Sequence, residues 1–323
     1  MGNCSWGNIM KRPPFKLNRI NPALNNTHVE NDRATNTNSE VWASYPVDYP
    51  GPSVLVPRDT IIAARKADKN TTLAPDGLGM VCGGVTMSFK GPDPNDWLDA
   101  PTIETYPVQL PGFAAAVKRV SYAAAREDVR YYLNGVVLQV ASDAIHVVAT
   151  DGHRLEFIEL PPVPDLRQGE YMFPTECLKF IDSDILRLES LYAQVGDWLI
   201  TKLVDGTYPR WRRIVPTAKY TAIVDRDEFM TALKTLLPFT DKSYNQVMIE
   251  YTLTALKITV GTLSSIKIDA TCSSDMTVGY DCSYLIDAIK QCDSVVTIGY
   301  TDPSSSILIN DTAVVMPIKI VNN

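Results

Sequence analysis

The sequence predicts an α+β protein built from three similar modules, each with helices packed on antiparallel strands. Two helical patterns recur about one module apart: FAAAVKRV at residues 113–120 and FMTALKTL at residues 229–236 share a Phe, an Ala, a Lys and two aliphatic positions at equal offsets. A second element, a short strand that runs into a helix, recurs at residues 54–62, 171–178 and 281–290. Self-similarity on this scale indicates repeated domains and not a solenoid, whose repeats are only ~20–50 residues long.

Each of the two longer helical segments has one apolar side. In residues 113–120 and 229–236 the Phe and the aliphatic residues occupy positions i, i+4 and i+7, which form a single stripe on an α-helix. The lysine at i+5 falls beside this stripe, so each helix is expected to bury one side and expose a cation. In the strand-to-helix element, Pro57 and Pro174 stand where the helix begins, a position at which the missing amide hydrogen costs nothing.

Alternating, β-branched segments surround these helices and predict antiparallel strands. They are residues 135–148, 198–204, 247–260 and 295–309. Proline-containing turns near residues 106 and 220 separate the modules. The expected domains are therefore 1–105, 106–220 and 221–323, each of ordinary domain size. A domain repeated head to tail with a constant rotation can close into a ring.

The composition excludes several classes of protein. Hydrophobic residues make up 45% and charged residues 21% of the chain, and no apolar run reaches the ~18 residues that a membrane span needs. The first residues fit neither a myristoylation pattern nor a secretory leader, so a cytoplasmic protein is expected. Six cysteines without a C-x-x-C pair favour reduced, buried thiols over a metal site. We expect no cofactor and no metal.

The net charge of −7 argues against a protein that binds nucleic acid simply by being basic. It leaves open a ring held on DNA by its topology, because such a ring needs only a weakly basic inner wall. Net charge alone does not separate this case from an ordinary cytosolic enzyme.

Four motifs of seven or eight residues follow one another along the chain. They are VRYYLNG (129–135), ATDGHRL (149–155), KLVDGTYP (202–209) and VVMPIKI (314–320). In this order they closely resemble the bacterial DNA polymerase III beta subunit, the beta sliding clamp, from about Val54 to the C-terminus. The resemblance implies the DNA clamp fold: three repeated clamp domains per chain, with helices on the inner face, antiparallel sheet outside, and two protomers closed into a ring.

For function, the resemblance implies a sliding clamp: a processivity factor in DNA replication that encircles duplex DNA and tethers the replicative polymerase and other clients. Such a protein is a non-catalytic homodimer that contacts phosphates without reading sequence. Its loading requires a partner, an ATP-dependent clamp loader, because the chain has no G-x-x-x-x-G-K-[ST] motif.

By their place in the helix pairs, a set of cations is expected to face DNA. They are Arg58, Arg65, Lys66, Lys118, Arg119, Lys179, Lys234 and Lys290. Any one of them can equally belong to an ordinary solvated helix face.

The resemblance further implies a client-peptide pocket between the second and third modules, which takes a short Gln-rich peptide with Leu or Phe anchors. Its residues would be Leu133, Thr150, Gly152, His153, Arg154, Leu155, Pro209, Arg213, Ile214, Tyr244, Tyr284, Val314, Val315, Met316, Pro317 and Ile318. Aliphatic residues and an adaptable Met suit apolar anchors, while His153 and Arg154 would supply polar rim groups. Without the resemblance, some of these positions would be interpreted as ordinary core: Leu133, Val314, Val315 and Ile318.

The sequence departs from the family at both ends of the chain. Residues 21–26 resemble the family's early Pro-Ile-Leu stretch, and only about twenty residues precede them. Because these include Pro13 and Pro14, which would break a helix, the first DNA-facing helix is expected to be missing or replaced. A compact version of this kind would suit a virus or mobile element. Asp281 stands where the family often has a neutral amide, and residues 321–323 extend the tail; either could change client preference.

Two other functions stay open. The first is a non-encircling clamp relative that binds client peptides as a regulator or competitor. The second is a hydrolase that uses Asp151 and His153 as an acid/base pair, but the sequence offers no nucleophile, oxyanion loop or metal partner beside them.

Overall fold

The computed structural model describes residues 22–68, 70–242, 244–261 and 264–318. The chain forms two compact units, each built around one long antiparallel sheet. The first unit takes in the chain up to Ala114 together with Asp165–Arg167 and Glu176–Val204. The second comprises Ala115–Pro164, Gln168–Thr175 and the chain from Asp205 onward.

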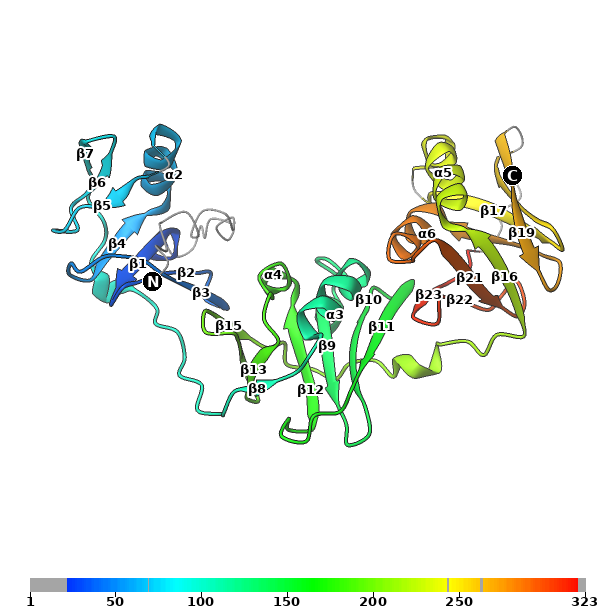
Figure 1. Cartoon of the computed structure of the whole chain (residues 1–323), viewed down its shortest axis with the longest axis horizontal. Coiled ribbons are helices and arrows are strands. Elements are labelled where there is room, and N and C mark those ends of the chain that lie inside the picture. The colour runs from blue at the N-terminus through cyan, green and yellow to red at the C-terminus, as the bar shows by residue number, and fades with distance from the viewer. Residues whose placement is uncertain (1–21, 69, 243, 262–263, 319–323) are drawn as a thin grey trace. The chain divides into compact units, whose positions relative to one another are not determined.

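The sheet of the first unit has eight strands in the order β4-β1-β2-β3-β15-β14-β13-β8 (Figure 1). Their bounds are β1 Asn26–Glu30, β2 Arg33–Thr37, β3 Val41–Pro46, β4 Val54–Pro57, β8 Val108–Gln109, β13 Ile185–Leu188, β14 Tyr192–Val195 and β15 Leu199–Lys202. The pairing of β3 with β15, with Ala43 opposite Leu199, joins two segments that are distant in the sequence.

The first unit also contains a helix and a small second sheet. Helix α2 (Arg58–Ala67) continues directly from β4 and buries Ile61 and Ala64. Beside it lies a three-stranded sheet in the order β5-β6-β7. The remaining elements are β5 Thr72–Leu73, β6 Gly79–Cys82, β7 Val85–Ser88, and the 3-10 turns η1 Pro22–Asn25 and η2 Pro94–Asp96.

The sheet of the second unit has twelve strands in the order β12-β9-β10-β11-β23-β22-β21-β16-β19-β18-β17-β20. Their bounds are β9 Gly135–Val140, β10 Ile145–Thr150, β11 Arg154–Leu160, β12 Gly169–Pro174, β16 Tyr220–Asp225, β17 Gln246–Thr252, β18 Ala255–Val260, β19 Ser264–Cys272, β20 Met276–Asp281, β21 Val295–Tyr300, β22 Ile307–Ile309 and β23 Ala313–Val315. The pairing of β11 with β23 places Leu155 opposite Val314 and makes the sheet continuous.

Helices α5 and α6 cover the C-terminal part of this sheet, as Figure 1 shows. Phe229 and Leu233 of α5 and Leu285 of α6 are 0% exposed and belong to one apolar core with the strands beneath them. The helices outside the first unit's α2 are α3 Phe113–Val120, α4 Thr175–Leu178, α5 Arg226–Leu236 and α6 Cys282–Ile289, with the 3-10 turns η3 Ser121–Ala123, η4 Tyr131–Leu133, η5 Trp211–Arg213 and η6 Leu237–Phe239.

The structure confirms the helical stripes that the sequence predicts. Phe113, Val117 and Val120 are 0% exposed, and the equivalent side of α5 is buried in the same way. Lys118 and Lys234 lie exposed beside the two stripes. The helix predicted after β12 is a single turn, because the chain leaves α4 at Leu178. The sheets run across residues 106 and 220, and the division into three domains stays a prediction.

Several expectations concern the cysteines and the chain ends. Cys177, Cys272 and Cys282 are buried, while Cys82 and Cys292 are half-buried, and burial raises the pKa of the Cys177 and Cys282 thiols to about 12. Three expectations fall outside the described residues: the one for Cys4, the one that the first DNA-facing helix is missing or replaced, and the one for the tail at residues 321–323. Across the part of the chain that the structure describes, no helix has the length and apolarity to span a bilayer.

Candidate partner-binding site

The turn between β10 and β11, residues 151–153, is held by its own side chains. Thr150 Oγ1 donates to the carbonyl oxygen of Arg154 at 2.6 Å and accepts the amide of Gly152 at 3.0 Å. Asp151 Oδ1 accepts the amides of His153 and Arg154 at 2.9 and 3.0 Å. These bonds satisfy the turn's amides and fix the direction in which the side chains of His153 and Arg154 leave the backbone.

Gly152 sits in this turn at φ +92°, a region that side chains with a Cβ disfavour. An added Cβ would also approach Nη1 of Arg130 to 2.9 Å. We expect Gly152→Ala to lower the free energy of unfolding by about 1–2 kcal/mol, measured by urea denaturation. Gly206→Ala is the matched control, since its Cβ would meet nothing nearer than 3.4 Å. Equal, small effects of both changes would contradict the strain at Gly152.

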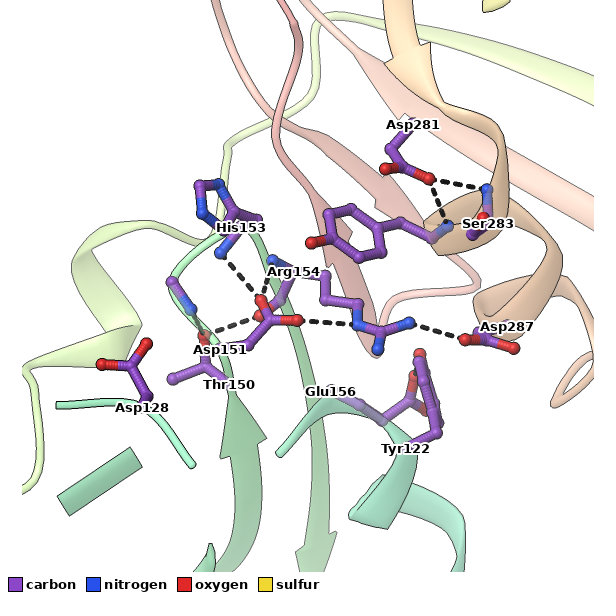
Figure 2. A network of polar contacts seen from close by, with 12 residues as sticks. Tyr122, Asp128, Thr150, Asp151, His153, Arg154, Glu156, Asp281, Ser283 and Asp287 are labelled. Carbon is purple, nitrogen blue, oxygen red and sulfur yellow. Dashed lines mark hydrogen bonds and ion pairs between the residues drawn. The ribbon is translucent and has the colours of Figure 1, made fainter. Parts of the chain in front are cut away.

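Arg154 connects the turn to helix α6 (Figure 2). Its Nε lies 3.0 Å from Asp151 Oδ2, and its Nη1 lies 2.7 Å from Asp287 Oδ2. The guanidinium stands 4.5 Å from the centre of the Tyr284 ring. The side chain is only 14% exposed, so both ion pairs are shielded from water and contribute more than surface pairs do.

Asp281 and Asp287 form the α6 side of the contact with Arg154. Asp281 caps α6 by accepting the amides of Ser283 and Tyr284 at 2.7 and 3.2 Å, and burial raises its pKa. Burial would also raise the pKa of Asp287, but hydrogen bonds from Lys290 and Arg154 more than offset it and hold the value below the usual range. The carboxylate at 281 therefore has a local role in the helix cap, which positions the Tyr284 ring.

A buried carboxylate lies behind Arg154. Glu156 is 0% exposed and accepts hydrogen bonds from Tyr122 Oη at 2.7 Å and Arg119 Nε at 3.0 Å. Burial, followed by the Glu156 charge, raises the pKa of Tyr122, so its hydroxyl remains a donor. The Tyr122 ring is 5.3 Å from the Arg154 guanidinium. The network thus continues from the exposed turn into the core.

A second arginine holds the turn from outside. Arg130 binds Asp128 through Nε and Nη2 at 3.0 and 2.8 Å, and its Nη2 also donates to the carbonyl oxygen of Asp151 at 3.0 Å. The hydrogen bonds from Arg130 lower the pKa of Asp128 to about 2. Asp128 and Arg130 thereby hold the backbone of the turn at Asp151, just before His153.

The C-terminal strand completes the site. Strand β23 pairs with β11, with Val315 opposite Arg154, and the amide of Met316 donates to the carbonyl oxygen of His153 at 2.9 Å. The His153 ring stacks on Tyr284 with centroids 6.3 Å apart. The structure therefore brings together nine of the predicted pocket residues: Thr150, Gly152, His153, Arg154, Leu155, Tyr284, Val314, Val315 and Met316.

Known proteins resemble this chain in both sequence and fold. Residues 108–210 match the family model described as DNA polymerase III beta subunit, central domain. The beta sliding clamp of Proteus mirabilis is 29% identical over 230 residues, which cover 63% of this chain and 62% of that protein. Over the matched region, the chain is similar to the bacterial beta sliding clamps. The matched region thus spans less than two thirds of the relative's length.

Solved sliding clamps share the whole architecture. The DNA polymerase sliding clamp of Pseudomonas aeruginosa superposes with a TM-score of 0.81 at 22% identity, covering 94% of both chains. The sliding clamp of Bartonella birtlesii gives 0.84 at 21% identity, with 94% and 93% covered. These likenesses confirm the predicted α+β clamp fold.

Some residues that the clamp resemblance assigns to the pocket are core residues in this structure. The five are 3% exposed or less: Leu133, Thr150, Leu155, Val314 and Val315. All but Leu133 lie in β10, β11 and β23, where strand pairing and packing remove them from water. They lie beneath the exposed residues of the site, and their assignment to the client-peptide pocket stays a prediction.

Other assigned residues lie apart from the turn. Tyr244 is 66% exposed before β17, and Ile318 bridges to Gly279. Ile214, 41% exposed, accepts a hydrogen bond from Ser306 through its carbonyl oxygen. Within the described ranges, no hydrogen bond, ion pair or ring contact links the turn to this remaining group: Pro209, Arg213, Ile214, Tyr244, Pro317 and Ile318.

The cations expected to face DNA differ in their surroundings. Arg58 is 4% exposed and its Nη2 donates to Asn25 Oδ1 at 3.0 Å, so little of its guanidinium is open to a phosphate, and its contact with DNA stays a prediction. Arg119 is tied to Glu156, and Lys290 to Asp287 at 2.9 Å. Arg65 is half-buried, while four lysines are exposed: Lys66, Lys118, Lys179 and Lys234.

Sequence reasoning missed the residues that hold the clamp-like site together. Asp287, Glu156 and Tyr122 are absent from the predicted set. A signal exists for Asp287, because it lies three residues after Tyr284 on the same helix and interrupts an apolar run. Asp151, considered only as a catalytic acid, binds the amides of the turn and Arg154.

Proposed function

We propose that this chain is a DNA sliding clamp, a non-catalytic processivity factor that encircles duplex DNA and tethers polymerase and other clients. The observation that carries the proposal is the match of the clamp fold over 94% of the chain, joined to the beta-subunit match at residues 108–210. Two cytoplasmic copies, each with domains 1–105, 106–220 and 221–323, would close the ring. An ATP-dependent loader would open it.

The charge of the chain supports retention on DNA by enclosure. The net charge of −7 gives no general attraction for phosphate, so binding must come from local cations and from enclosure. Lys118 and Lys234 are exposed beside the buried stripes of helices α3 and α5, each five residues after the phenylalanine that starts the stripe. Such lysines would contact phosphates, which carry no sequence information, so they would hold the duplex whatever its sequence.

Client peptides would bind over the turn of residues 151–153 and the start of the C-terminal tail. Met316 is 37% exposed there, next to the stacked rings of His153 and Tyr284. A flexible thioether and aromatic faces suit Leu and Phe anchors, and the amide-rich turn suits a Gln side chain. A small site of this kind gives weak binding that allows clients to exchange, and two sites per dimer raise the effective concentration.

Met316→Ala is expected to weaken binding of a Gln-rich, Leu/Phe-containing clamp-binding peptide by about 1–3 kcal/mol, because it removes an apolar contact at the centre of the site. Calorimetric titration of the intact protein measures the change. Leu253→Ala serves as control, since Leu253 is 63% exposed in the β17–β18 turn. A dissociation constant that Met316→Ala leaves unchanged would place the site elsewhere.

Ring closure is tested by mass in solution and by negative-stain images. The proposal predicts dimers that appear as closed rings. Monomers at every concentration, with peptide binding intact, would contradict encirclement and favour a non-encircling relative that competes for client peptides.

A further inference from the structure

The sheet of the first unit carries a cavity of about 500 Å³. Its walls come from one side of β1, β2 and β3, from residues 97–100, and from the start of β15. The volume lies in the range typical of ligand pockets. All of its lining residues belong to the first unit, and neither the DNA-facing helices nor the turn of residues 151–153 contributes to it.

Three tryptophans line this cavity: Trp42, Trp97 and Trp198. Trp97 and Trp198 are half-buried and keep ring surface for a ligand, whereas Trp42 is 4% exposed and forms part of the cavity wall. Trp42 Nε1 donates to the carbonyl oxygen of Leu98 at 3.1 Å, and Trp198 Nε1 donates to Asp182 Oδ1 at 3.1 Å. Because the polar edge of Trp198 is already bonded, its exposed surface is mainly ring, and the electron-rich face of an indole attracts cations.

The cavity is also acidic. Glu30, Asp99 and Asp197 are exposed at it, and within the described residues none of the three carboxylates has an ion-pair partner. The one arginine, Arg33, has two of its three nitrogens engaged, with Nε 2.8 Å from Ser44 Oγ and Nη2 within 3.1 Å of the carbonyl oxygens of Ser44 and Asp197. Three carboxylates therefore face one internally bonded guanidinium.

His28 adds no positive charge to this balance near neutral pH. Its Nε2 lies 2.8 Å from Ser53 Oγ, and its ring centre is 5.3 Å from that of Trp97. Burial lowers its pKa, although Glu30 and Asp99 act in the opposite direction. The cavity thus combines aromatic surface with a net negative charge.

We propose that this cavity binds the arginine side chain of a basic peptide segment from a partner protein. A planar guanidinium can stack on an indole face and direct its fork of donors to carboxylates, which a lysine ammonium does less well. Phosphate groups would be repelled by the same carboxylates, so nucleic acid is not the ligand. The site is independent of the clamp function proposed above.

A blocked Gly-Gly-Arg-Gly-Gly peptide tests the proposal on the full chain, with tryptophan fluorescence and calorimetry as readouts. We expect saturable binding that weakens about tenfold when citrulline, which keeps the shape but not the charge, replaces arginine. Equal binding of the citrulline peptide would overturn the proposal. If blocked free arginine binds as tightly as the peptide, the assignment to a peptide ligand is overturned.

Paired variants locate the site. Glu30→Gln with Asp99→Asn should weaken the arginine peptide about tenfold, because two of the three unpaired carboxylates are lost. Glu40→Gln with Asp48→Asn makes the same change at exposed positions outside the cavity and should leave binding unchanged. If both pairs bind like the unaltered chain, the cavity is not the site; thermal unfolding of each pair verifies that it is folded.

Discussion

Arg119→Met is expected to lower the free energy of unfolding by about 3 kcal/mol, a magnitude typical of breaking a buried ion pair from one side. The change leaves the Glu156 carboxylate, 0% exposed, with Tyr122 as its remaining side-chain donor. Arg119 itself is 37% exposed, so most of the cost comes from the carboxylate that stays buried. Urea denaturation followed by circular dichroism measures the difference.

Lys118→Met is the matched control for this prediction. Lys118 is the preceding residue of α3, is exposed, and is also a candidate for contact with DNA. Its substitution should change the free energy of unfolding by no more than about 0.5 kcal/mol. Glu156→Gln added to Arg119→Met should recover part of the loss, because the buried charge is then gone. If Arg119→Met and Lys118→Met cost the same small amount, the buried pair contributes little.

Phe229→Ala is expected to lower the free energy of unfolding by about 3–5 kcal/mol, the usual cost of a large cavity in a packed core. Phe229 is 0% exposed at the start of the α5 stripe, where it packs against the strands of the second unit. Chemical denaturation with a fixed m-value measures the loss.

Phe239→Ala provides the comparison, since Phe239 lies in the turn that follows α5 and is 65% exposed. The same atoms are removed there without leaving a buried cavity, so the change should stay within about 0.5 kcal/mol. A similar cost at both positions would mean that α5 does not anchor the core.

The sequence is sufficient to predict the helices and much of the sheet, because buried residues recur at a regular spacing in each. The spacing is three to four residues in a helix and two in a strand. The stripe of Phe229, Leu233 and Leu236 repeats at helical spacing, and the structure buries all three at 3% exposure or less. The Asp281 cap follows from a local rule in the same way. Periodicity does not reveal that β3 pairs with β15, since that pairing depends on contacts between distant segments.

The site is predicted less completely for the same reason. Arg154 meets Asp287 across 133 residues only because β11 pairs with β23, and no local pattern encodes that meeting. Resemblance transfers positions but not exposure: Leu155 and Val314, which it assigns to the pocket, are 0% and 1% exposed. The burial of Arg58 is likewise not evident from the sequence, since a charged residue at a helix start is usually solvated.

Retention on DNA tests the central claim most directly. The protein is loaded onto nicked circular duplex DNA with a clamp loader and ATP, and half of the sample is then cut to linear form. A sliding clamp remains on the circle and is lost from the linear DNA by running off its ends. Equal loss from circular and linear DNA would contradict encirclement.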